Sequence, residues 1–278
     1  MSSNLPPINS CNLFYTYTDL DQAWHFYRDI LGYETLMDRN LAKVMRVSKD
    51  STITLADASL GINSPEENKC VTLAVVTPQV EAWYDYLTRS GVSMHREYNP
   101  KPGDAHDGFV ALDPEGYFLE FERFNPHAEN DEKLLPILSE IEPLIDQTGK
   151  RPAELAVQGT VVWLYYPELE AQQRFYEALF GVDLMVDQGW AKVYQISETG
   201  FVGLVDGARG LHQVTETKGV TVSFLVDNLQ AWRQQADAQP AFSLKEDGPN
   251  SFAGLDLGGY LLRWDQVRDI EDLYSNIV

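Results

Sequence analysis

A glutamate and a histidine in the first half of the chain carry side chains that can do proton chemistry. Glu120 lies in the run FLEFERF, where strand alternation places Phe118, Glu120 and Glu122 on one face. In a cavity this carboxylate could act as a base, bind a metal or attract a cationic ligand. Beside Glu122 and Arg123 it could instead be an exposed or ion-paired strand residue. His106, in the stretch PKPGDAHDGF, could act as a general base or a replacement metal ligand near Glu120, or could be a solvated loop residue.

The elements that must position these residues occur twice in the chain. Residues 19–57 and 168–206 align without a gap, at an offset of 149 residues from Asp19 to Glu168. Ungapped identity across a helix, a turn and strands exceeds what shared helical periodicity produces, so we infer a duplication. Among the recurring residues, Leu20, Phe26, Tyr27, Gly32 and Asp38 return as Leu169, Phe175, Tyr176, Gly181 and Asp187.

Each copy divides into two units of one strand, one helix and three strands. In the first unit 12–18 alternates as a strand, 20–31 has apolar residues at helical spacing, and three short strand-like runs follow. A second unit spans 71–123, and units near 158–206 and 219–266 complete the set. The predicted fold class is therefore α+β, built from four βαβββ units.

The composition between the copies predicts the domain boundaries. Prolines, charges and a short amphipathic stretch near 132–145 are typical of a linker that contains a helix. We expect a first domain at 8–124, a linker at 125–155, a second domain at 156–268 and a C-terminal tail at 269–278.

Four such units resemble the vicinal-oxygen-chelate superfamily, which includes glyoxalases, bleomycin-resistance proteins and extradiol dioxygenases. The resemblance is carried by DLDQAWHFYRDILGYE in the first unit, ELEAQQRFYEALFG in the third, and DPEGYFLEFERF, which is similar to the family's D-P-x-G-x-x-x-E closing strand. It covers nearly the whole chain outside the linker and tails. It implies two tandem glyoxalase-like domains whose cup-shaped, mostly antiparallel sheets curl around cavities. The reaction stays open, because the family includes metal-dependent enzymes and metal-free drug-binding proteins.

The resemblance also implies where metal ligands would lie, namely at the start of each unit's first strand and at a glutamate late in its last strand. In the first copy these positions hold Asn12, Thr72 and Glu120. In the second copy they hold Val161, Thr221 and Arg263. Valine has no donor atom, and arginine is a fixed cation that opposes a metal. We expect the second domain to lack the inherited metal site and the first to lack it too, with a divalent metal at Glu120 as the alternative.

Strand alternation predicts which residues face the two cavities. Asn12, Phe14 and Thr16 should line the first cavity with Thr72 opposite, and the second should be lined by Trp163, Tyr165, Thr221 and Arg263. Aromatic walls and one arginine suit a flat or anionic organic ligand. The same aromatic residues could equally be ordinary core.

The charge and cysteine content narrow the partners and the compartment. Forty-two acidic and 21 basic residues give a formal net charge of −21, which disfavours nucleic acid and anionic membranes as partners. The first residues lack the basic and apolar regions of a signal peptide. Cys11 and Cys70 are too few for a disulfide framework. We expect a cytoplasmic protein, monomeric or homodimeric, that binds a small molecule.

Three functions remain open. The sequence favours a small-molecule binding protein without a cofactor. The first alternative is a metal-dependent lyase, isomerase or ring-cleaving dioxygenase that uses Glu120 and His106. The second is a regulatory or scaffolding protein with one degenerate domain. The sequence also leaves open whether the units pair within each copy or swap between chains.

Overall fold

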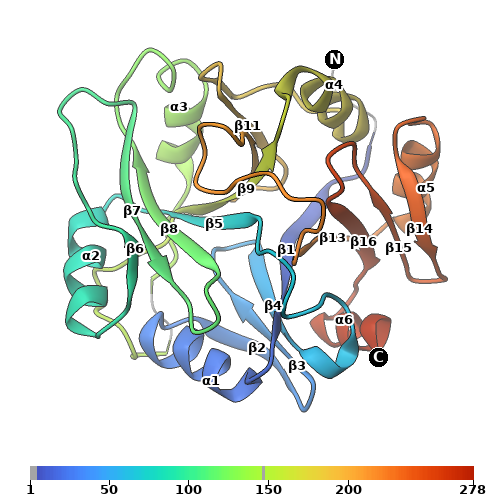
Figure 1. The fold of residues 1–278 in the computed structure, drawn as a ribbon, viewed down its shortest axis with the longest axis horizontal. Coiled ribbons are helices and arrows are strands. Elements are labelled where there is room, and N and C mark those ends of the chain that lie inside the picture. Colours follow the sequence, from blue (N-terminus) through green and yellow to red (C-terminus); the bar gives the residue numbers. More distant parts are fainter. Residues whose placement is uncertain (1–4, 146–147) are drawn as a thin grey trace.

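The computed structural model describes residues 5–145 and 148–278, and it consists of two eight-stranded sheets with helices around them (Figure 1). Sheet A has the strand order β14 (Ser243–Asp247), β15 (Ser251–Leu255), β16 (Leu261–Gln266), β13 (Thr221–Val226), β1 (Ile8–Tyr17), β4 (Ser51–Asp57), β3 (Ala42–Arg46) and β2 (Glu34–Arg39). Sheet B has the order β10 (Val186–Asp187), β11 (Ala191–Gln195), β12 (Gly200–Asp206), β9 (Gly159–Tyr166), β5 (Val71–Val76), β8 (Phe118–Phe124), β7 (His106–Leu112) and β6 (Met94–Arg96). These strands form the four predicted βαβββ units, so the α+β class is confirmed.

The units pair between the two copies of the repeat. Sheet A joins the first unit to the fourth through the antiparallel pair β1 and β13, and sheet B joins the second unit to the third through β5 and β9. Within each unit the first strand runs parallel to the last, and the other pairs are antiparallel. Each sheet therefore contains strands from both halves of the chain.

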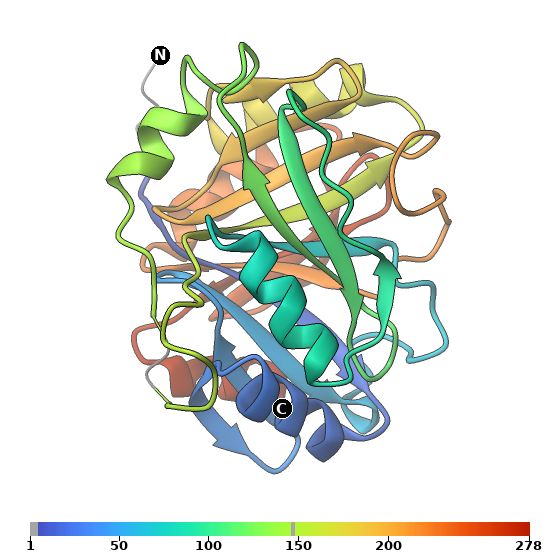
Figure 2. The same cartoon turned by 90° about the vertical axis from the view of Figure 1, so that its left-hand side faces the viewer.

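One helix in each unit packs beside its own strands. These helices are α1 (Leu20–His25), which continues as a π-helical turn at Phe26–Ile30, α2 (Val80–Arg89), α4 (Leu169–Phe180) and α5 (Leu229–Asp237). Helix α2 lies against β7 and β8 (Figure 2). A 3-10 turn at Ala58–Leu60 follows β4. In the described parts of the chain, no helix is long and apolar enough to cross a membrane.

Two more helices follow the closing strands of the two copies. Helix α3 (Leu134–Glu140) lies in the predicted linker after β8, in agreement with the amphipathic stretch there. Helix α6 (Ile270–Ile277) follows β16 and makes up most of the segment expected to be a tail. Its Asp269 cap belongs to a reciprocal capping box with Asp272, a local signal that begins a helix.

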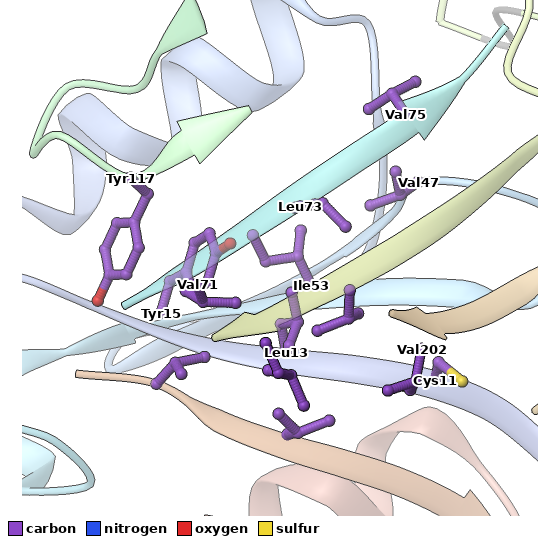
Figure 3. Close-up of a cluster of buried hydrophobic side chains, with 14 of the residues drawn as sticks. Cys11, Leu13, Tyr15, Val47, Ile53, Val71, Leu73, Val75, Tyr117 and Val202 are labelled. Atoms are coloured by element: carbon purple, nitrogen blue, oxygen red, sulfur yellow. The ribbon is translucent and has the colours of Figure 1, made fainter. Parts of the chain in front are cut away.

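The main hydrophobic core lies between the two sheets. Leu13 and Tyr15 of β1 belong to the same buried cluster as Val71 and Leu73 of β5, as Figure 3 shows. The strand alternation predicted from the sequence thus turns one face of β1 into this core. The opposite faces of the two sheets, here called the outer faces, belong to two separate clusters.

Two aspartates tie the sheets together at equivalent places. Asp113 accepts hydrogen bonds from the hydroxyls of Tyr17 (2.6 Å) and Tyr27 (3.1 Å) and from the backbone N–H of Tyr117 (2.8 Å). In the second copy, Asp256 makes the same contacts with Tyr166, Tyr176 and Tyr260. Burial nevertheless raises the pKa of Asp113 to about 6, against the opposing effect of these donors.

We predict that the contribution of Asp113 to the free energy of unfolding decreases as the pH rises. Its folded-state pKa lies above the unfolded value, so its stabilising contribution is present at low pH and disappears as the pH passes 6. Asp113→Asn should remove this dependence. The free energy of unfolding of wild type relative to Asp113→Asn should fall by about 1 kcal/mol between pH 5 and pH 7, measured by urea denaturation. A difference that stays constant over this range would contradict the prediction. Asp256→Asn provides the matched variant and should change in the same direction.

Candidate functional site

A pocket opens on the outer face of sheet B, with a cavity volume of about 60 Å³ and a mouth open to solvent. Strands β8 and β9 supply its floor and one wall, and the loop after β12 supplies another part. The side chains that line it include Glu120, Glu122, His106, Trp163, Tyr165, Trp190, Arg96 and Arg209.

Two glutamates of β8 form the floor of the pocket. Glu120 is 9% exposed and Glu122 is 1% exposed. The neighbouring Arg123 pairs with Glu81 and Asp107 instead. The alternative that Glu120 is an exposed or ion-paired strand residue is therefore wrong, because the alternation of β8 turns both glutamates toward the pocket and Arg123 away from it.

Burial makes both carboxyl groups hold protons more tightly than usual. It raises the pKa of Glu120 to about 7, while the charge of Arg96 acts in the opposite direction. The pKa of Glu122 is raised well above its ordinary value, first by burial and then by Glu120, with the Trp163 indole opposing. Glu120 can thus donate or accept a proton near neutral pH, whereas Glu122 favours its protonated form.

Aromatic side chains form the walls. Trp163 and Tyr165 come from β9 and so from the second copy of the repeat. The Tyr165 hydroxyl hydrogen-bonds the Thr72 hydroxyl at 2.7 Å, which fixes the tyrosine ring over β5. Trp190 lies at the edge, with the Arg209 guanidinium 5.1 Å from its ring centre.

His106 also reaches this pocket. It is the first residue of β7, and its ring centre is 6.5 Å from that of Trp190. Burial lowers the pKa of His106, so the neutral imidazole is favoured. His106 and Glu120 thus both line this pocket.

The predicted cavity partners are distributed differently from the sequence expectation. Glu120, His106, Thr72, Trp163 and Tyr165 gather at sheet B, whereas Asn12, Phe14, Thr16, Thr221 and Arg263 lie on sheet A. The expectation that Asn12, Phe14 and Thr16 face Thr72, and that Trp163 and Tyr165 face Thr221 and Arg263, is wrong. The physical reason is that the units exchange partners between the copies.

The outer face of sheet A is filled by the chain itself. Leu273 of α6 is fully buried there, against Phe14 and Leu225. Asn12 accepts hydrogen bonds from Thr52 and Thr54, both at 3.0 Å. These contacts give Asn12 and Phe14 a structural role.

Arg263 is held in the same way beneath α6. Its side chain donates to Asp265 and Glu246 and to the backbone oxygen of Asn276 in α6. The aspartate also accepts a hydrogen bond from Ser223 at 2.8 Å. The predicted arginine for an anionic ligand is therefore engaged within the protein.

The strand register locates all the inherited metal positions. Glu120 lies opposite Ala74, and by the repeat its counterparts are Arg263 opposite Ser223, Thr54 opposite Phe14, and Gly203 opposite Trp163. On sheet B the set is Thr72, Glu120, Val161 and Gly203, in which one residue has a good donor. Among the residues described, no three histidine, cysteine, aspartate or glutamate side chains gather where they could hold a metal ion. The residues at these positions do not fit the family's metal site.

The indole of Trp163 lies directly against Gly203. A Cβ atom added to Gly203 would lie 2.0 Å from Cε3 of Trp163. The indole thus occupies the space that a side chain at position 203 would need, and it forms an aromatic wall of the pocket.

Several residues of the pocket were not predicted from the sequence. Glu122 could have been found, because it shares the strand face of Glu120. Arg96 and Arg209 carry no such signal, since a short edge strand and an irregular loop position them.

The comparisons with known proteins agree with this architecture. Residues 8–121 match the profile of the Glyoxalase/Bleomycin resistance protein/Dioxygenase superfamily. Glyoxalase I from Zea mays superimposes with a TM-score of 0.66 at 16% identity, over 98% of this chain and 95% of that chain. The CppA protein of Streptococcus pneumoniae gives a TM-score of 0.51 at 14% identity, over 95% of this chain and 100% of that chain. No curated protein sequence matches the chain.

Residues 8–121 are thus similar in sequence to the glyoxalase/bleomycin-resistance/dioxygenase superfamily, and the whole chain has a fold similar to that of glyoxalase I. At these identities the likeness to solved structures concerns the fold alone.

We predict that Gly203→Ala displaces Trp163 and destabilises the protein by about 1–3 kcal/mol, as other overpacked cores do. Urea denaturation followed by tryptophan fluorescence measures both effects. Gly248→Ala is the control, because its added Cβ would approach no atom closer than 3.4 Å, and it should stay close to wild type. Equal stability of the two variants would contradict the prediction, because it would show that the Trp163 side chain moves aside without an energetic cost.

We also predict that Leu273→Ala costs about 2–5 kcal/mol, because it leaves a cavity between α6 and sheet A. Val278→Ala, at a residue that is 70% exposed, should change little. Thermal and urea denaturation of the two variants provide the measurement. A loss in Leu273→Ala no larger than that in Val278→Ala would mean that α6 does not stabilise sheet A.

Proposed function

We propose that this protein binds a small organic molecule in the pocket of sheet B, without the inherited metal ion of its superfamily. The observation that carries the proposal is the pair of buried glutamates, Glu120 and Glu122, between the aromatic walls of an open pocket.

The energetic cost of these glutamates supports a binding role. Burying a carboxyl group without an ionic partner costs stability, and such groups concentrate at functional sites. A folded core would be better served by apolar residues at both positions. The outer face of sheet A illustrates this, because Leu273 and Phe14 close it.

The chemistry of the donor positions supports the absence of a resident metal. Thr72 is a weak ligand and is already bonded to Tyr165, while Val161 and Gly203 have no donor side chain. Divalent transition metals bind tightly when several nitrogen, oxygen or sulfur donors converge. Glu120 alone does not meet that requirement.

A metal-dependent lyase, isomerase or ring-cleaving dioxygenase remains the alternative. The observation in its favour is that His106 and Glu122 share the pocket with Glu120. In that case Glu120 would be the metal ligand or base and His106 a second proton acceptor.

We further infer a cytoplasmic protein, monomeric or homodimeric, that does not bind nucleic acid or membranes. The net charge of −21 supports the exclusion of polyanionic partners. Both cysteines are buried and free, which supports a reducing compartment.

Metal content tests the proposal against its alternative. We expect protein purified without a chelator or metal-binding tag to contain far less than one metal ion per chain by elemental analysis. Titration calorimetry with Mn²⁺, Fe²⁺, Ni²⁺ and Zn²⁺ should show no stoichiometric site, and Glu120→Gln should give the same result. One metal per chain that disappears in Glu120→Gln would establish the enzyme alternative.

Ligand binding is tested separately by thermal shift with a broad library of small aromatic compounds. Compounds that raise the Tm of wild type should lose this effect in Trp163→Leu, which removes a pocket wall. Leu273→Ala serves as a control for lowered stability, because it lies in the other sheet. A library without a single stabilising compound would count against the proposed function.

A further inference from the structure

The charges of the sheet B pocket are arranged in a fixed order from mouth to floor. Arg96 and Arg209 are exposed and line the mouth, whereas Glu120 and Glu122 are buried at the floor. Neither arginine takes part in an ion pair within residues 5–145 and 148–278. The pocket therefore presents cations outside and acidic groups inside, and the Arg209 guanidinium lies over the ring of Trp190.

The floor has hydrogen-bonding capacity that the protein does not use. The Oε1 atom of Glu122 and the Nε1–H of Trp163 are both buried, and neither has a hydrogen-bond partner in the part of the chain that the structure describes. The buried Asp113 and Asp265 differ, since hydroxyl, guanidinium or backbone donors surround them. A buried acceptor without a donor costs about 1–3 kcal/mol, so a bound donor would remove a standing penalty.

A basic nitrogen would be a suitable partner for the two glutamates at the floor. An ammonium or amidinium group has several N–H donors and a positive charge, and it can contact both glutamates, which are two residues apart on one strand face. Trp163 and Tyr165 add aromatic faces, which attract cations and pack against flat rings. On binding, the ligand's positive charge would take the place of a carboxyl proton.

The two arginines at the mouth favour a negatively charged group of the ligand. A carboxylate or another anionic group on the ligand would lie between the two unpaired guanidinium groups, which favour planar anions. A purely cationic ligand would have to pass these arginines without compensation. A purely anionic ligand would leave the glutamates without a partner.

We propose that the pocket of sheet B is specific for aromatic zwitterions, with the basic nitrogen at Glu120 and Glu122 and the acidic group at Arg96 and Arg209. This inference rests on the proposed function and names its ligand class. It replaces the sequence expectation of an anion held by Arg263, which lies in sheet A and is paired there.

Four matched indole compounds test the charge requirement on the full-length protein. Tryptophan has both charges, tryptamine the amine alone, indole-3-propionate the acid alone, and 3-methylindole neither. Ligand-observed NMR and calorimetry avoid interference from protein fluorescence. We expect tryptophan to bind about tenfold or more tightly than each of the other three, because it alone offers a charged partner to both the glutamates and the arginines.

Variants assign each charge to its end of the pocket. Glu122→Gln should reduce the advantage of tryptophan over indole-3-propionate, and Arg209→Gln should reduce its advantage over tryptamine. Arg89→Gln, at an exposed arginine of α2 outside the pocket, should leave all affinities unchanged.

The outcomes separate this inference from the proposed function. If the indoles bind but tryptophan has no advantage, or the variants leave its advantage intact, the zwitterion proposal is overturned and small-molecule binding stands. If none of the four binds, the zwitterion proposal is also overturned, and the library screen decides the proposed function independently.

Discussion

The exchange of partners between the two copies is the constraint on which the rest of the structure depends. Because β1 pairs with β13 and β5 with β9, neither half of the chain can complete a sheet by itself. Each outer face is therefore built from two sequences that are free to diverge. At sheet B this places the glutamates of the first copy opposite the tryptophan and tyrosine of the second. The Asp113 and Asp256 clusters then connect units of the same copy across the two sheets, so that both kinds of pairing hold the molecule together.

Much of this architecture could be predicted from local sequence patterns. The repeat and the alternation of its strands are local properties, and they correctly separated Leu13 and Tyr15 of the core from Asn12 and Phe14 of the outer face. The closing-strand motif placed Glu120 in a cavity. The pairing of the units could not be predicted, because the first strands β1, β5, β9 and β13 are all buried and similar, and any of them offers a suitable edge to another. Register between distant strands depends on the whole assembly.

The segments that follow the closing strands explain why the two outer faces differ. Helix α6 places Leu273 in the middle of sheet A, where Phe14, Met37 and Val44 enclose it. Helix α3 places Leu134 and Leu138 against sheet B but leaves the region of Glu120 open. The sequence suggested a helix in the linker and a plain tail at the end. An eight-residue helix has too few turns to stand out by periodicity, and its stability comes from the surface that it covers.

The positions where the family resemblance implies metal ligands also differ between the two outer faces. On sheet A, Thr54 donates to Asn12 and Arg263 donates to Asp265, although the Nδ2 atom of Asn12 has no hydrogen-bond partner within the described residues. On sheet B a tryptophan fills the space above Gly203, and a buried glutamate keeps an oxygen without a donor. Buried polar groups that are fully bonded contribute to structure, whereas those without partners lower stability until something binds. The two outer faces thus differ in how they are filled, because Leu273 of α6 covers sheet A whereas two buried glutamates of sheet B line an open pocket.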